Sequence, residues 1–386
     1  MISLYDNTIS ESDIKKLIDW LGQSPTPRIT KGPLTIEFEK LWAKYIGTKY
    51  AVFCNSGSSA NLLMLYALIA SKLLKNNKVV VPGLCWATDL SPVLQFNLEP
   101  VLCDINLDTL SVDLKHLEEI FKTEKPACLL LVSILGFSPN YNEIKRLCKE
   151  YDVILLGDHC ESFGTAYEGN KLGNCGELMS SYSMFVSHHL CTIEGGMVTT
   201  NDKDMYDMLI MLRSHGWSRD LDKEKQKELQ TKWNIDDFNN LYSFYVPGFN
   251  LRSTDLQAFI GIGQLDKADK IINRRNENYY LYKKYLKNDF WMPKPEHNSF
   301  TSNFCFPIIH PKRDEIAKAL IQNNVETRPL ICGSMGKQPM YIEKYGVKEL
   351  PNCNVVDNYG LYVPNNPSLT EDDIKFVCEI INKVIN

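Results

Sequence analysis

The sequence lacks long apolar runs, basic tails and closely spaced cysteine pairs. No stretch approaches the roughly 18 apolar residues that cross a membrane, and the first residues lack the charged and apolar regions of a signal peptide. The net charge is -5 and neither end is rich in lysine or arginine, so no basic field attracts nucleic acid. We therefore expect a cytoplasmic protein that binds a small molecule and has neither nucleic acid nor a membrane as a partner.

The twelve cysteines have no Cys-x-x-Cys or Cys-x-Cys spacing, so the sequence offers no zinc or iron-sulfur signature. Most of them lie in apolar runs, as Cys128 does, and a reduced cysteine in such a run behaves as a small hydrophobic residue. Because intracellular thiols normally stay reduced, we predict structural thiols and no metal site.

Short apolar runs alternate with segments of helical periodicity from about residue 35 onward. The runs lie at residues 50–53, 78–81, 100–103, 128–132 and 153–156. Continuous apolar strands that alternate with helices predict an α/β protein whose mostly parallel sheet is covered on both faces. In such sheets, ligands bind beyond the carboxyl ends of the strands.

The last third of the chain has a different pattern. A long, tyrosine-rich helical stretch follows residue 274, and after several prolines come apolar residues at 308–309 and a helical pattern at 315–320. This pattern predicts a smaller α+β domain. We place the large domain at residues 1–265 and the smaller domain at residues 266–386, since 386 residues suffice for more than one core.

A small, hydroxyl-rich turn follows the first predicted strand. It contains Ser56, Gly57 and Ser58 and leads into an apolar helical segment. Such a turn presents free backbone amides and the positive end of the helix dipole, which suits a phosphate. The alternative interpretation is a plain helix cap without a ligand.

Residues 181–198 resemble the cofactor-lysine segment of the DegT/DnrJ/EryC1/StrS family of sugar aminotransferases, which use pyridoxal phosphate (PLP). In that family a lysine lies five residues after a phosphate-binding serine, here Ser183, and six before a glutamate, here Glu194. His188 occupies the lysine position. An imidazole can take up and return protons near neutral pH, but it cannot form the Schiff base that holds PLP covalently.

The resemblance covers nearly the whole chain and implies an aspartate-aminotransferase-like (type I) fold, with a mixed, mainly parallel sheet in the large domain. It implies that the phosphate lies near Gly57, Ser58 and Ser183. Trp86 matches the aromatic residue that stacks on the cofactor, although a core tryptophan is the alternative. The remaining matches are Asp158, at the acid that keeps the pyridine nitrogen protonated, and Glu161, beside the ring oxygen, where the family usually has Gln or His. Outside this context Asp158 could be an ordinary turn residue.

A later segment, residues 246–258, resembles the family's Gly-Tyr-Asn-x-Arg segment. The asparagine of that segment reaches the phosphate bound in the partner subunit, and Asn250 occupies its position. The resemblance therefore implies a homodimer in which each active site is completed by Asn250 from the partner subunit.

Within the family, histidine in place of the lysine marks 3-dehydratases of nucleotide-linked 4-keto-6-deoxy sugars, which use pyridoxamine phosphate (PMP). The resemblance implies a GDP-linked substrate, L-glutamate as amino donor, released ammonia and a 3,6-dideoxy-4-keto sugar for a surface polysaccharide such as lipopolysaccharide or capsule. His188 would be the catalytic base, with a pKa near 7. His215 and Arg328 would bind substrate, with a surface salt bridge as the alternative for Arg328.

Several alternatives stay open at this point. The chain could be a true aminotransferase that uses another lysine, Lys171 or Lys203 being the nearest in sequence, or a noncatalytic ligand sensor with a PLP-enzyme fold. His189 could replace His188 as the base, and His159 could support Asp158. The sequence distinguishes neither a hexose from a heptose nor the stereochemistry of the sugar.

Overall fold

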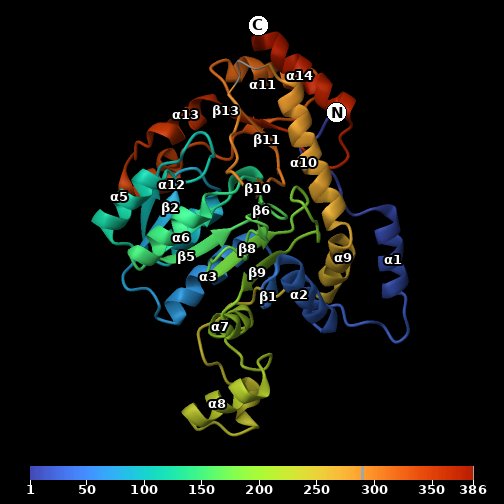
Figure 1. Cartoon of the computed structure of the whole chain (residues 1–386). Coiled ribbons are helices and arrows are strands. Elements are labelled where there is room, and N and C mark those ends of the chain that lie inside the picture. Colours follow the sequence, from blue (N-terminus) through green and yellow to red (C-terminus); the bar gives the residue numbers. More distant parts are fainter. Residues whose placement is uncertain (288–290, 386) are drawn as a thin grey trace.

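The computed structural model describes residues 1–287 and 291–385 (Figure 1). Its centre is a seven-stranded sheet in the order β1-β9-β8-β5-β4-β2-β3. The strands are β1 (Tyr50–Cys54), β2 (Lys78–Pro82), β3 (Glu99–Cys103), β4 (Cys128–Val132), β5 (Ile154–Asp158), β8 (Met179–Ser183) and β9 (Gly196–Thr200). The five strands predicted from apolar runs are confirmed, with small shifts at their ends.

The sheet is mixed and mainly parallel, as predicted. Its one antiparallel member is β9, which pairs with β1 on one side and β8 on the other. The remaining neighbours pair in parallel. As a result, the segments that follow β1, β2, β4, β5 and β8 all emerge at the same edge of the sheet.

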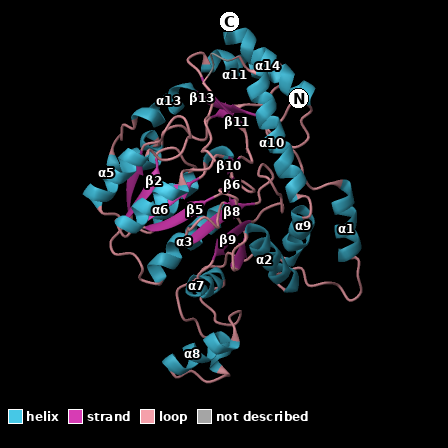
Figure 2. Cartoon of the chain, viewed as in Figure 1, coloured by secondary structure: helices cyan, strands magenta, loops and turns pink. Residues whose placement is uncertain are grey.

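Helices cover both faces of this sheet (Figure 2). Alternate residues of β4 enter different cores: Leu130 belongs to a core that includes residues of α3 and α7, and Leu129 to one that includes residues of α5 and α6. Because successive side chains of a strand point to opposite faces, a strand covered on both faces reads as a continuous apolar run. The helices of the first 265 residues are α1 (Glu11–Leu21), α2 (Pro33–Ile46), α3 (Gly57–Ala70), α4 (Ala87–Gln95), α5 (Leu114–Glu124), α6 (Tyr141–Glu150), α7 (Lys203–Arg213), α8 (Lys223–Trp233) and α9 (Asp255–Leu265), with the short helices η1 (Ile134–Gly136) and η2 (Asn239–Tyr242).

A second, antiparallel sheet of three strands lies in the last third of the chain, in the order β11-β13-β12. Its strands are β11 (Phe306–Ile309), β12 (Arg328–Pro329) and β13 (Gly360–Val363). The accompanying helices are α10 (Ala268–Tyr285), α11 (Arg313–Gln322), η3 (Met335–Lys337), α12 (Pro339–Tyr345), α13 (Pro351–Tyr359) and α14 (Glu371–Ile385). A small third sheet joins β6 (Ala166–Tyr167), β7 (Asn170–Lys171) and β10 (Ser299–Phe300).

The predicted domain division falls between α9 and α10 and stays a prediction; residues 288–290 and 386 of the predicted smaller domain lie outside the described residues. The N-terminal residues contact the other part of the chain, since Ile2 pairs with Val325 and the Leu4 backbone N–H donates to Glu326.

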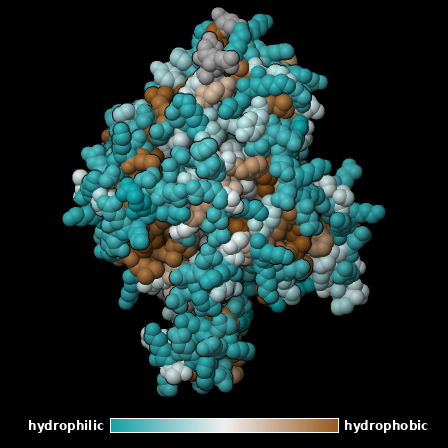
Figure 3. Space-filling model, viewed as in Figure 1, coloured by the Kyte–Doolittle hydropathy of each residue, from teal (hydrophilic) through white to brown (hydrophobic). Residues whose placement is uncertain are grey.

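Helix α8 and η2 form an arm that projects from the body (Figure 1). Several large apolar side chains on and beside this arm are exposed to solvent, namely Trp233, Phe238, Leu241, Tyr242 and Phe244. Further hydrophobic residues gather on the body just above the arm (Figure 3). Within the described part of the chain, no helix combines the length and the apolar character needed to cross a membrane.

Candidate active site

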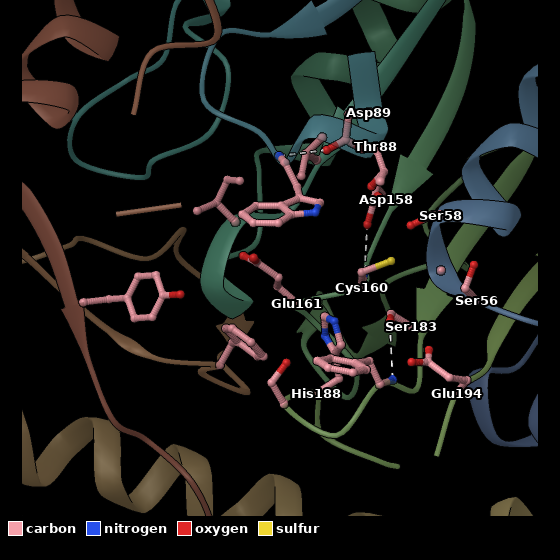
Figure 4. Close-up of a pocket in the computed structure, with 18 residues that line it drawn as sticks. Ser56, Ser58, Thr88, Asp89, Asp158, Cys160, Glu161, Ser183, His188 and Glu194 are labelled. Carbon is pink, nitrogen blue, oxygen red and sulfur yellow. Dashed lines mark hydrogen bonds between the residues drawn. The ribbon is translucent and has the colours of Figure 1, made fainter. Parts of the chain in front are cut away.

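A cavity of about 450 Å³ opens where the strand ends of the large sheet meet (Figure 4). It lies at the edge predicted for ligands in a sheet of this kind. Most of the predicted site residues line it, although they come from four separate segments: Gly57, Ser58, Trp86, Asp158, Glu161, Ser183 and His188.

The predicted phosphate turn forms one end of the cavity. Helix α3 begins at Gly57, and Ser56 caps it by accepting a hydrogen bond from the Ser59 backbone N–H at 3.1 Å. The other N–H groups of a first helical turn have no partner within the helix and can bind an anion. A Cβ atom at Gly57 would lie 2.6 Å from the Cβ of Ser183, so only glycine lets the turn and β8 approach this closely.

Asp158 ends strand β5 and is only 4% exposed. Its Oδ2 accepts a hydrogen bond from Asn61 Nδ2 at 2.5 Å, and its Oδ1 accepts one from the Cys160 backbone N–H at 2.8 Å. The Ser181 hydroxyl holds the other end of the Asn61 amide at 2.5 Å. Asp158 is therefore a fixed carboxyl group that lines the cavity, in position to bind a cationic ring nitrogen.

A second buried carboxyl group, Asp89, belongs to the same cluster. Asp89 Oδ1 accepts from the same Asn61 Nδ2 atom at 3.1 Å, and Asp89 Oδ2 accepts from the Trp86 backbone N–H at 3.1 Å. Burial, followed by the neighbouring charge of Asp158, raises the pKa of Asp89 well above its usual range. We call Asp89, Asp158, Asn61 and Ser181 the acid cluster.

Trp86 is 55% exposed while lining the cavity, so the alternative of a core tryptophan is wrong. It is the N-cap residue of α4, and Asp89 fixes its backbone. An exposed aromatic ring beside a cavity offers a flat apolar surface on which another ring can stack.

Glu161 and His188 also face the cavity (Figure 4). Glu161 accepts a hydrogen bond from the Leu135 backbone N–H at 2.8 Å, and burial raises its pKa to about 7. Burial has the opposite effect on His188 and lowers its pKa to about 4, which differs from the ordinary value expected above. His188 is therefore a neutral imidazole at pH 7.

His188 lies between β8 and β9, with its ring 5.2 Å from that of Phe304. Its Nδ1 atom is buried, and nothing among the described residues forms a hydrogen bond with it. A buried polar atom without a partner calls for an explanation, and a role in catalysis is one of those known.

The neighbouring histidines have other environments. His189 is fully buried, and its Nε2 lies 3.1 Å from the Ser302 carbonyl oxygen. His159 is also fully buried, with its Nε2 3.1 Å from Glu177 and its Nδ1 3.2 Å from the Ser133 hydroxyl. The Nδ1 atom of His189 is also buried without a partner among the described residues, so what favours His188 over His189 as the group that meets a ligand is that only His188 lines the cavity. The contacts of His159 place it behind Asp158 in the core.

Three predicted site residues do not line the cavity of their own chain. Asn250 is exposed and pairs with Ser214, and His215 Nε2 lies 3.4 Å from an Arg252 nitrogen. Arg328 is exposed and forms the surface salt bridge weighed above, at 2.6 Å from Glu326.

The lysines proposed for a true aminotransferase point elsewhere. The Lys171 ammonium donates to the Tyr45 carbonyl oxygen at 2.8 Å, and Lys203 pairs with Asp207 and Asp222. Among the described residues, no lysine lines the cavity.

Sequence reasoning missed several residues that line the cavity or support it. Asp89 has a local signal, because an acid three residues after Trp86 fits a helix capping position. Phe304 and Tyr362 line the cavity from the last third of the chain, and no local pattern there indicates this. No group of His, Cys, Asp and Glu side chains suited to a metal ion occurs in the described ranges, where all twelve cysteines are free thiols.

Comparison with known proteins gives one consistent family. The family model for the DegT/DnrJ/EryC1/StrS aminotransferase family matches residues 8–382. The GDP-4-keto-6-deoxy-D-mannose 3-dehydratase of Yersinia pseudotuberculosis is 33% identical over 365 residues, which is 92% of each chain. The enzyme of the same name from Escherichia coli O55:H7 is 34% identical over 91% of this chain and 92% of its own.

A solved structure gives the same result. The crystal structure of GDP-4-keto-6-deoxymannose-3-dehydratase with a trapped PLP-glutamate geminal diamine has a TM-score of 0.89 and 30% identity. The aligned region includes 98% of this chain and 100% of the chain in that crystal structure. This likeness confirms the predicted fold of the PLP-dependent aminotransferases.

Proposed function

The chain belongs to the DegT/DnrJ/EryC1/StrS aminotransferase family, and from this premise we propose that it is a 3-dehydratase of a nucleotide-linked 4-keto-6-deoxy sugar. The substrate carries GDP, as in the names of the relatives, and the product is a 3,6-dideoxy-4-keto sugar. L-glutamate supplies the amino group, which leaves as ammonia. The observation that carries this proposal is His188 in the lysine position of a cavity that keeps the rest of the predicted cofactor site.

The cavity residues fit PLP and PMP. Gly57, Ser58 and Ser183 surround a place for a phosphate, and Asp158 offers a fixed carboxyl group to the ring nitrogen. Trp86 offers an exposed ring for stacking. When bound, the cofactor supplies an amine that condenses with the sugar ketone and a ring that withdraws electrons from the reacting carbons.

His188 moves the proton in this proposal. Its imidazole is neutral at pH 7, so it can accept a proton from a carbon acid without losing one first. Its buried Nδ1 atom has no hydrogen-bond partner among the described residues, so no protein group engages that nitrogen. After it has taken the proton, the imidazolium can return it to the departing C3 hydroxyl group, so that one residue serves as base and acid.

The active site is completed by a second copy of the chain. Asn250 is exposed and lies away from the cavity of its own chain, as a residue that serves the partner subunit must. The exposed apolar side chains of the arm, Phe238 and Tyr242 among them, offer surface that a partner would cover. His215 and Arg328 are proposed to contact the nucleotide sugar at the edge of this shared site.

Mass spectrometry of the products tests the reaction. Purified protein is incubated with PLP, L-glutamate and GDP-4-keto-6-deoxymannose. A dehydratase gives a nucleotide sugar one oxygen atom lighter and releases ammonia, whereas an aminotransferase gives an amino sugar and no ammonia. A protein that binds the substrate but forms neither product would be a ligand sensor, the third interpretation.

A further inference from the structure

The acid cluster holds two carboxyl groups where a ring nitrogen needs only one. Asp89 is 1% exposed and Asp158 is 4% exposed, and the same Asn61 nitrogen donates to both. Two carboxylates held this close in a buried site repel each other, so one of them keeps its proton. The pair then has one negative charge instead of two.

The hydrogen bonds indicate which carboxyl group keeps the proton. Both oxygens of Asp158 accept N–H groups of the protein, one from Asn61 at 2.5 Å and one from the Cys160 backbone at 2.8 Å, which favours its ionised form. Asp89 accepts two longer bonds, each of 3.1 Å, and is the more deeply buried of the two.

We propose that Asp89 is a positioning residue for Asp158: it carries a proton at neutral pH, donates it in a hydrogen bond to Asp158, and so holds that carboxylate toward the cofactor ring. Asp89 also accepts the backbone N–H of Trp86, so it links the residue that binds the ring nitrogen to the residue that stacks on the ring. This inference rests on the proposed function only in that PLP or PMP occupies the cavity.

The surroundings of Asp89 keep it neutral. The groups that act on it are the carboxyl groups of Asp158 and Glu161 and, from the other elements packed against it, the thiols of Cys85, Cys160 and Cys332. None of these groups is a cation that could stabilise a negative charge on Asp89, and the two carboxyl groups oppose one when ionised.

The first test counts protons in the protein without added cofactor. A carboxyl group that stays protonated in the folded protein but ionises in the unfolded chain favours unfolding as pH rises. The free energy of unfolding therefore falls above the pKa of about 3.9 that the group has in the unfolded chain. The Asp89→Asn variant keeps a donor for Asp158 and an acceptor for the Trp86 N–H but does not titrate. We expect its unfolding temperature to gain about 2 °C or more on the wild type between about pH 4 and pH 7.

Asp202→Asn is the matched control, because Asp202 caps α7 by accepting the Met205 N–H at 2.9 Å and is exposed to solvent. The difference in unfolding temperature between Asp202→Asn and the wild type should not grow with pH in this way. If the difference in unfolding temperature between Asp89→Asn and the wild type also does not grow with pH, Asp89 is an ionised helix cap and the proposal is wrong.

The second test measures PLP affinity by quenching of tryptophan fluorescence. Asp89→Asn should bind PLP within about threefold of the wild type, and Asp89→Leu, which has no donor, should bind about tenfold or more weakly. If the wild type and Asp89→Leu bind PLP equally well, Asp89 has no positioning role. The same conclusion follows if Asp89→Asn binds PLP as weakly as Asp89→Leu. Neither outcome contradicts the proposed function. A folded wild type that does not bind PLP overturns the proposed function itself.

Discussion

The acid cluster and the surroundings of His188 lie on two sides of one cavity and differ in how their polar groups are satisfied (Figure 4). Asp158 has a hydrogen-bond partner on each oxygen, and Asn61 is held at both ends. The buried Nδ1 atom of His188, by contrast, has no partner among the described residues. The hydrogen bonds of the cluster hold the Asp158 carboxyl group still, whereas one ring nitrogen of His188 is not engaged by another protein group.

The pKa values differ in the same sense. Burial favours the neutral form of every group, so it raises the pKa of Asp89 and of Glu161 and lowers that of His188. At pH 7 the cavity therefore has a protonated Asp89 and a partly protonated Glu161 on one side and an unprotonated His188 on the other. The following predictions would break or sharpen this contrast, and they are ordered from the largest expected effect to the smallest.

Replacing the free base should have the largest effect. In His188→Lys, an amine replaces the imidazole, so PLP should become covalently attached and product formation should fall by about 10²- to 10⁴-fold. The absorbance spectrum and borohydride reduction followed by peptide mapping check the attachment. The control Lys171→Ala should keep its activity; loss of activity there, or an active His188→Lys variant without attached cofactor, would contradict the role of His188.

Asn250→Ala should weaken cofactor retention by about tenfold or more, because a hydrogen bond to a charged group is worth about 1.5–3 kcal/mol. Dialysis followed by measurement of bound PLP gives the effect. Mixing this variant with inactive His188→Asn under conditions of subunit exchange should restore some activity, since one site of the heterodimer carries neither change. Confirmed heterodimers without activity would show that the site is not shared.

The pH dependence of stability should separate Glu161 from His188. Burial raises the pKa of Glu161 to about 7. Its contribution to the free energy of unfolding is therefore fully present below the pKa of about 4.3 in the unfolded chain and is lost as pH rises toward 7. Burial lowers the pKa of His188 to about 4. Its contribution to the free energy of unfolding is therefore fully present above the pKa of about 6.5 in the unfolded chain and is lost as pH falls toward 4.

Urea unfolding of the protein without cofactor checks both signs. Relative to the wild type, Glu161→Gln should gain stability as pH rises from about 4.5 to about 7, and His188→Asn should gain it as pH falls from about 6.5 to about 4, by about 1–3 kcal/mol each. If both variants gained stability in the same direction of pH change, the contrast between acid and base would be contradicted.

Asn61→Leu should lower the free energy of unfolding by about 1–3 kcal/mol, because it leaves buried polar groups of the acid cluster without partners. Urea unfolding at pH 7 measures this change. The exposed Lys15, replaced by alanine, serves as the control and should change stability by less than about 1 kcal/mol. An unchanged Asn61→Leu would mean that the acid cluster does not depend on its amide.

Local sequence patterns were enough to predict the strands and to point to the residues at their ends. Runs such as residues 128–132 are continuous and apolar because both faces of the sheet are covered, and Asp158 and Ser183 end the strands where parallel sheets bind ligands. The role of His188 was predicted from the resemblance of one short segment to the family's cofactor-lysine segment. Its unusual pKa was not, because desolvation depends on neighbours such as Phe304, which are distant in sequence.

The sequence by itself determined the sheet, the cofactor motif and the replacement of a lysine by His188, since each is written in a few consecutive residues. Only the tertiary structure decided which side chains share the cavity. It brought Asp89 beside Asp158, placed Tyr362 at the cavity and left Arg328 paired with Glu326. The physical reason is that proximity and burial arise from packing between distant segments, and these set hydrogen bonding and protonation.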